Sequence, residues 1–139
     1  MTRPLPLSDE LTAEFWDSVR TGRLRIQWCP PCARFNHPPA WLCPGCGSEN
    51  LTYREVSGRG RVYSFTIVHD PPAPGFRDLV PLLIGVVELV EQPHLLMVSN
   101  LLDVDPGAVS IGLEVAVTFE AVAPDCTLPQ FRPVGGSFG

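Results

Sequence analysis

Apolar and polar positions alternate along most of this chain, which predicts a mainly β protein with one helix near its N-terminus. The helix is expected over residues 8–20, where three apolar side chains repeat at four-residue intervals: Leu11, Phe15 and Val19. Ser8 is suited to cap its start and Gly22 to end it. Trp16 adjoins the apolar stripe, so this helix either covers the core or uses Phe15 and Trp16 to contact another subunit.

The hydrophobic period changes to two after the helix, as a half-buried strand requires. The first strand is expected at residues 24–28 and leads directly to a cysteine. A longer strand is predicted at residues 58–69, where β-branched and aromatic residues are dense. Further short strands are predicted at 81–90, 94–102 and 113–122. About five antiparallel strands within roughly 80 residues, with no clear helix, are typical of the five-stranded OB architecture, a small closed barrel.

Proline and glycine interrupt the alternation between these strands. Residues 33–42 are expected to form a short hairpin, with Pro38 and Pro39 forcing an extended turn. The stretch 70–79 has three prolines and a glycine and is predicted to be a loop. That loop is long and apolar for an exposed connector, so Phe76 and Arg77 within it are candidates for contact with a partner.

Four of the five cysteines form the most specific motif of the chain, two Cys-x2-Cys pairs separated by ten residues: Cys29, Cys32, Cys43 and Cys46. Two intervening residues let both thiolates of a pair turn toward one ion, and zinc takes four such ligands at about 2.3 Å. A site closed by four protein ligands has no position for substrate, so a structural zinc is predicted. Iron in the same ligands, as in a rubredoxin-like electron carrier, is the alternative.

The remaining metal-binding and nucleophilic residue types carry little signal. His37 lies between the cysteine pairs, but four thiolates already complete a tetrahedral site, so a surface position is expected for it. Cys126 is interpreted as an ordinary buried or half-buried thiol. The chain has no G-x-S-x-G elbow, P-loop or H-E-x-x-H helix, and its histidines are scattered. The sequence therefore favours a binding or scaffolding protein, with no catalytic residue assigned.

These elements predict four successive segments. An N-terminal helical segment, a zinc ribbon, an OB-fold barrel and a flexible tail are expected in that order, at residues 1–22, 23–56, 57–133 and 134–139. No apolar run is long enough to cross a bilayer and no signal-peptide core begins the chain, so a cytoplasmic protein without a membrane is expected. A reducing compartment favours metal ligation over disulfides.

Charge is distributed unevenly around a net of −5. Residues 20–61 carry seven arginines against two glutamates, whereas residues 62–139 are strongly acidic. Phosphate-backbone affinity needs several cations, so the acidic total argues against general nucleic-acid binding. A single-stranded nucleic-acid-binding OB module stays an alternative. Arg59 and Arg61 lie two residues apart on one face of a predicted strand and could hold the phosphates of one nucleotide-like cofactor.

A family resemblance runs through nearly the whole chain, from about residue 11 to residue 133. It rests on the helix with Phe15-Trp16, the cysteine pairs with PPxxxCPxCGS, the strand SGRGRVYSFTIVH, a proline-rich loop, the G-x-x-V-x-V-x-F stretch and the closing LPxFRP. This order resembles the OB-fold proteins with a rubredoxin-like zinc ribbon, known as domain-of-unknown-function family thirty-five.

The resemblance implies a noncatalytic subunit that supports a thiolase-fold enzyme acting on acyl-CoA, such as a retro-aldol lyase that shortens steroid side chains. It implies structural zinc in the four cysteines and a ribbon-and-barrel surface near CoA, where Arg59 and Arg61 would contact phosphates. A dimeric thiolase-fold partner would impose a two-plus-two assembly. Phe15, Trp16, Phe76 and Arg77 are then the candidate partner contacts.

Overall fold

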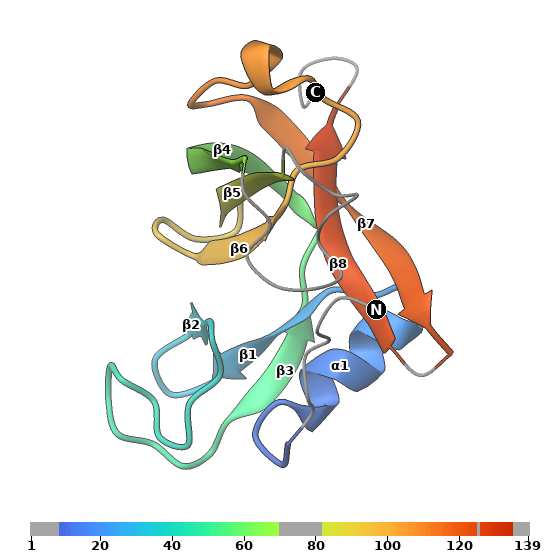
Figure 1. Cartoon of the computed structure of the whole chain (residues 1–139). Coiled ribbons are helices and arrows are strands. Elements are labelled where there is room, and N and C mark those ends of the chain that lie inside the picture. The colour runs from blue at the N-terminus through green and yellow to red at the C-terminus, as the bar shows by residue number, and fades with distance from the viewer. Residues whose placement is uncertain (1–8, 70–81, 125, 135–139) are drawn as a thin grey trace.

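Two antiparallel sheets and one helix make up the computed structural model, which describes residues 9–69, 82–124 and 126–134 (Figure 1). The helix lies at the junction, where it contacts β1 of the first sheet and β7 and β8 of the second. In chain order the elements are α1 Ala13–Arg20, β1 Arg25–Cys29, β2 Arg34–Asn36, β3 Thr52–Glu55, β4 Arg59–Val68, β5 Leu82–Leu89, β6 Leu96–Asn100, η2 Pro106–Ala108, β7 Glu114–Ala123 and β8 Cys126–Pro133.

The small sheet has the order β2-β1-β3 and forms the ribbon. Its central strand carries Trp28, whose ring packs edge-on against Phe35 of β2 with 4.7 Å between centroids. On the other side, the Arg54 guanidinium of β3 lies 4.7 Å from the Trp28 ring centroid, a cation–π contact. One aromatic residue thus joins all three short strands.

The larger sheet has the order β6-β5-β4-β7-β8 and curls toward a barrel. A bulge at Tyr63, between Val62 and Ser64, bends β4, which pairs with β5 along its length but with β7 only at its first three residues. Among the described residues the strand ladder stays open between β6 and β8, where one isolated bridge joins Leu101 to Phe131. The mainly β, OB-like fold is confirmed, but the closed barrel expected from the strand count is wrong.

The fifth barrel strand is β8, which the sequence pattern did not reveal. Pro129 and Pro133 argue against a strand, because proline cannot donate to a ladder. β8 is an edge strand, however, and it pairs with β7 alone along its length, so the missing donors are tolerated. Strand β3, in contrast, is no part of the barrel, because it pairs with β1 and belongs to the ribbon.

The helix begins later than the predicted N-cap at Ser8, which lies outside the described residues. Asp9 and Thr12 form a turn first: the Asp9 carboxylate accepts hydrogen bonds from the Thr12 N–H and hydroxyl at 2.8 and 3.0 Å. The helix then runs from Ala13, so the predicted start is wrong by about a turn. Its end is as expected, since Gly22 has φ of +79° and donates its N–H to the Val19 carbonyl.

The hairpin predicted within residues 33–42 is also placed differently. Arg34–Asn36 form β2, but they pair with β1 across the first cysteine turn rather than with a later part of the same segment. Residues after Asn36 have no regular strand until β3. Their backbone is held by Gln27 of β1, whose buried side-chain amide bonds both the N–H and the carbonyl of Ala40.

Ribbon, helix and barrel share one hydrophobic core. Its most buried members come from all three parts, and they include Val19 of α1, Ile26 of β1, and Val62, Val87, Val115 and Phe131 of the barrel. A polar clamp adds to this packing. The Gln92 side chain, in the turn between β5 and β6, accepts from the Phe35 N–H at 2.8 Å and donates to the Phe35 carbonyl at 3.0 Å.

Two predicted features lie outside the described residues. The first is the loop 70–79, which contains Phe76 and Arg77. The second is the predicted tail 134–139, of which only Val134 is described. Within the part of the chain that the structure describes, no helix has the length and apolarity needed to traverse a bilayer.

The Gln92 clamp generates a first prediction. Replacing Gln92 by Ala should lower the free energy of unfolding by about 1–3 kcal/mol, because the buried Phe35 backbone loses both partners. Gln92→Glu keeps the acceptor for the Phe35 N–H but sets a carboxylate oxygen against the Phe35 carbonyl, so it should also lower the free energy of unfolding. Urea unfolding of the three proteins measures this, and a Gln92→Ala protein as stable as the original would contradict it.

Candidate metal centre and apolar cleft

The four paired cysteines converge on one point of the ribbon. Their sulfur atoms all lie within 4.8 Å of one another: Cys29, Cys32, Cys43 and Cys46. The closest contacts run between the pairs, 3.6 Å from Cys29 to Cys46 and 3.7 Å from Cys43 to Cys32. This donor set fits a tetrahedral ion held by thiolates alone. The group includes no histidine, as predicted for His37.

Each cysteine pair lies in a backbone turn of the same type. The carbonyl of Cys29 accepts the N–H of Ala33, and the carbonyl of Cys43 accepts the N–H of Gly47, each at 2.8 Å. The residue that closes each turn is left-handed, with φ of 53° at Ala33 and 75° at Gly47. Gly45 is closely packed, since a Cβ there would lie 3.3 Å from the Cys32 sulfur. The two turns are therefore equivalent halves of one site.

Polar groups of β2 face this sulfur cluster. The buried Asn36 side-chain amide lies 3.7 Å from the Cys43 sulfur and donates to it. Burial raises the pKa of the Cys43 thiol, but hydrogen bonds from the backbone of Gly45 and Cys46 and from Asn36 lower it to about 6. The surroundings of Cys43 thus favour a thiolate, the form that binds a metal.

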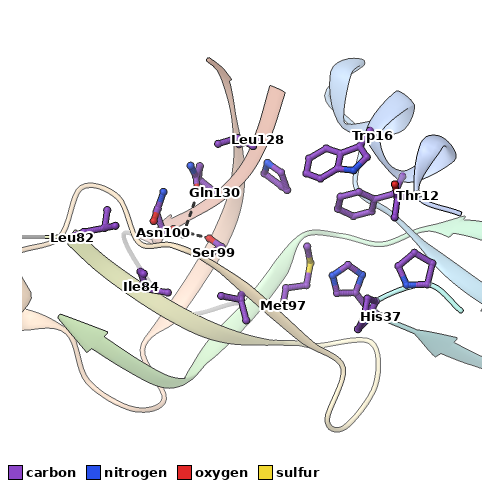
Figure 2. A pocket seen from close by; sticks show the side chains of 15 residues that line it. Thr12, Trp16, His37, Leu82, Ile84, Met97, Ser99, Asn100, Leu128 and Gln130 are labelled. Atoms are coloured by element: carbon purple, nitrogen blue, oxygen red, sulfur yellow. Dashed lines mark hydrogen bonds between the residues drawn. The ribbon is translucent and has the colours of Figure 1, made fainter. Parts of the chain in front are cut away.

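A second feature is an apolar cleft of about 510 Å³, lined by residues of α1, the ribbon and the barrel (Figure 2). We call it the junction cleft. Its described lining holds no aspartate, glutamate, arginine or lysine, and consists of Thr12, Phe15, Trp16, His37, Pro38, Pro39, Leu82, Ile84, Met97, Val98, Ser99, Asn100, Leu128, Pro129 and Gln130. Val98 stands out, because 71% of it is exposed.

Polar groups of the junction cleft bond to the chain itself. The Ser99 hydroxyl donates to the Asn100 carbonyl at 2.7 Å, and the Gln130 side chain accepts from the Asn100 N–H at 3.1 Å. Figure 2 shows these three residues gathered on one wall. The Thr12 hydroxyl is likewise bonded to Asp9. The cleft surface is therefore apolar in effect as well as in composition.

His37 lies in this cleft rather than on the open surface predicted for it. Its ring stacks at a tilt on Phe15, with 5.4 Å between centroids. Burial lowers the pKa of His37 to about 4, so the imidazole is neutral at physiological pH. The sequence argument had weighed only metal ligation against exposure, and it missed the helix that packs over this loop.

The two aromatic residues proposed for partner contact have different surroundings. Phe15 is 5% exposed and belongs to the core, where its inner side supports the cleft floor. Trp16 is partly buried at the cleft wall and packs edge-on against Phe15, with 5.0 Å between centroids. Both rings line the cleft, and Trp16 is the more exposed of the two.

Arg59 and Arg61 are both exposed. They line another hollow, of about 490 Å³, at the start of β4 and the end of β5. Arg61 is directly opposite Glu88 on β5 and Glu114 on β7, and its guanidinium lies 3.5 Å from the Glu114 carboxylate. The predicted pairing of the arginines on one face is thus present. Acidic neighbours, however, offset the charge of Arg61.

Comparison with known proteins identifies the two halves. The ChsH2 rubredoxin-like zinc ribbon domain matches residues 16–52, and the ChsH2 C-terminal OB-fold domain matches residues 53–120. A solved structure, the Ltp2-ChsH2(DUF35) aldolase, contains a chain 36% identical to this one, with a TM-score of 0.83, and the match covers 92% of this chain and 98% of that one. This chain belongs to the DUF35 family.

Relatives of this DUF35 protein differ in length and description. The 3-oxo-4,17-pregnadiene-20-carboxyl-CoA hydratase alpha subunit of Mycobacterium tuberculosis is 38% identical over 128 residues, which are 92% of this chain and 39% of that subunit. A DUF35 domain-containing scaffold protein of Methanothermobacter thermautotrophicus is 32% identical over 114 residues, covering 76% and 84% of the two chains. This chain spans about two fifths of the length of the hydratase alpha subunits it matches.

The junction cleft is the part of this DUF35 protein that sequence reasoning missed. Its residues come from five separate stretches of the chain, between residues 12 and 130, so no local motif marks them. One signal was present: β5 reads as a continuous apolar run, and alternate residues such as Ile84 point away from the core. A strand that is apolar on both faces indicates cover on its outer face.

The pKa of His37 generates a second prediction. Because burial lowers it from 6.5 to about 4, the unfolded chain binds more protons than the folded one between these values. Stability should therefore be complete above pH 6.5 and fall as the pH drops toward 4. His37 should account for about 2 kcal/mol of the loss between pH 7 and pH 5.

His37→Gln removes the titrating group and provides the comparison. Denaturant unfolding of both proteins at pH 7 and pH 5 should show a loss for the variant that is smaller by about that amount. Other acid-sensitive groups, including the thiols, are common to both proteins and cancel. Equal losses in the two proteins would contradict the assignment.

Proposed function

We propose that this DUF35 protein is a noncatalytic subunit that binds and supports a thiolase-fold enzyme acting on acyl-CoA, a retro-aldol lyase of steroid side-chain degradation. The observation that carries the proposal is its full-length similarity to the DUF35 chain of the Ltp2-ChsH2(DUF35) aldolase, at 36% identity over 98% of that chain. The steroid acyl-CoA hydratase subunit and the scaffold protein among its relatives support the same interpretation.

In this proposal the four cysteines hold a structural zinc. Four thiolates leave no open position, so the ion would stabilise the ribbon and take no part in cleavage. The ribbon strands are three to five residues long, and the stretch from His37 to Leu51 has no regular strand. A metal link between the two cysteine turns would hold this stretch in place. Two such chains with a dimeric partner would make a two-plus-two complex.

The acyl-CoA would lie near the interface, bound mainly by the partner. Arg59 and Arg61 are the proposed contacts for CoA phosphates. A phosphate would compete with the carboxylates of Glu88 and Glu114 for Arg61. Cleavage itself, which splits a β-hydroxyacyl-CoA into a carbonyl compound and a shorter acyl-CoA, would be carried out by the partner.

Coexpression tests the proposal. An Ltp2-like protein from the same organism should copurify with this chain, and the complex should cleave a β-hydroxy steroid acyl-CoA, detected as the ketone or aldehyde product. The isolated chain should give no turnover, and the partner alone should be less soluble or less active. Turnover by the isolated chain, or a partner equally soluble and active without it, would contradict the proposed role.

A further inference from the structure

We infer that the junction cleft is the docking site for an apolar, uncharged segment of the partner enzyme. This inference rests on the proposed function and specifies the surface that carries it out. Its starting point is charge: the described lining holds no ionised side chain, whereas the hollow around Arg59, Arg61 and Glu88 on the same barrel is charged. A charged occupant would lose hydration in the junction cleft without gaining a counter-charge.

The polar groups of the cleft favour a protein segment over a small ligand. Pockets for small molecules combine apolar walls with a few polar groups that orient the ligand. Here the hydroxyls of Thr12 and Ser99 and the amide of Gln130 are already bonded within the chain. The Trp16 indole, the His37 ring and the Asn100 side chain add polar atoms to the walls, but most of the lining residues are apolar. What the cleft offers an occupant is therefore mainly apolar surface, which suits apolar side chains.

Exposure along the rim points in the same direction. Val98 in β6 leaves 71% of its surface uncovered and lines the cleft together with the partly buried Ile84 and Trp16. Apolar side chains grouped in this way are typical of a surface that another protein covers, and tryptophan is frequent where such contacts are strong.

Position explains how docking would support the complex. The wall residues come from the helix, from ribbon residues 37–39 and from strands β5, β6 and β8, and Figure 2 shows Trp16, His37 and Met97 facing one space from these three parts. An apolar segment inserted there would contact all of them together. The partner would then hold the ribbon against the barrel, and in turn be held by both.

Val98→Asp tests the inference, because Val98 is mostly exposed in the isolated chain and the variant should fold. In the complex its carboxylate would be buried in an uncharged cleft, so affinity for the Ltp2-like partner should fall about tenfold or more. Ile111→Asp is the matched control, since Ile111 is 64% exposed and lines neither the cleft nor the arginine hollow. It should bind as the original chain does, measured by titration calorimetry.

The outcomes separate the two proposals. If the original chain binds the partner and Val98→Asp binds equally well, the docking site is wrong while the proposed function stands. If the original chain does not bind, both fail. If the isolated original chain is a dimer in solution and Val98→Asp makes it a monomer, the cleft joins two copies of this chain, and the inference is overturned.

A separate observation, the contact between β2 and the sulfur cluster, carries a second inference. We propose that Asn36 is a positioning residue that retains the metal by hydrogen-bonding the Cys43 thiolate. Its side-chain amide is buried and lies 3.7 Å from that sulfur. A thiolate site with four ligands carries excess negative charge, and a donor outside the ligands reduces it. On the same face of β2, the Arg34 guanidinium packs against Gly45 near Cys32.

Zinc release measures this role. The original chain should hold one zinc, and Asn36→Ala should release it to a colorimetric chelator about 10–100 times faster. Asn50→Ala, at an exposed asparagine of the same loop region, should release it at the original rate. Asn36→Asp provides a second variant of the same size, and it should also release zinc faster because an ionised carboxylate cannot donate.

A spectroscopic measurement excludes a merely structural effect. In the cobalt-loaded protein, loss of the donor should move the sulfur-to-cobalt charge-transfer band to lower energy, because the Cys43 sulfur becomes a stronger electron donor. An unchanged band together with an unchanged release rate in both Asn36 variants would overturn the inference.

Discussion

The convergence of four sulfur atoms within one small volume is the constraint on which the rest of this structure depends. The ribbon strands are short, and the stretch from His37 to Leu51 lacks a strand of its own. Backbone turns at Cys29 and Cys43 bring the thiols together, and an ion bound there would join the turns. Because His37, Pro38 and Pro39 precede Cys43 and line the junction cleft, the same link would also hold one wall of the cleft.

The ribbon, helix and barrel are linked by polar and apolar contacts at one junction. Helix α1 places Phe15 and Val19 in the core that all three parts share, and Gln92 bonds the backbone of Phe35 across the gap between the sheets. A ribbon anchored in this way presents a continuous surface with the barrel. In the proposed supporting role, a partner would contact ribbon and barrel together, and little ordering of the two would be needed on binding.

Much of the fold could be predicted from local patterns, and the errors have identifiable physical causes. The cysteine spacing gave the sulfur cluster, and the β-branched segments gave β4 to β7. Strand β8 was not predicted because it contains Pro129. Proline is tolerated in a strand mainly at a sheet edge, and the local sequence does not show which strand lies at an edge. The helix started late because Asp9 and Thr12 satisfy each other in a turn. His37 was placed on the surface because the packing of α1 over residue 37 is a long-range contact.

The sequence by itself determined the sulfur cluster, the order of ribbon and barrel and the family, because these depend on spacing and on short-range periodicity. Only the tertiary structure decided where β8 pairs, that the ladder between the described strands stays open, and that five separate stretches of the chain enclose an uncharged cleft. It also placed Arg61 between two glutamates, a neighbourhood set by the register of β4 with β5 and β7. Such features arise when strands meet, and the free energy that selects them comes from contacts between residues far apart in the chain.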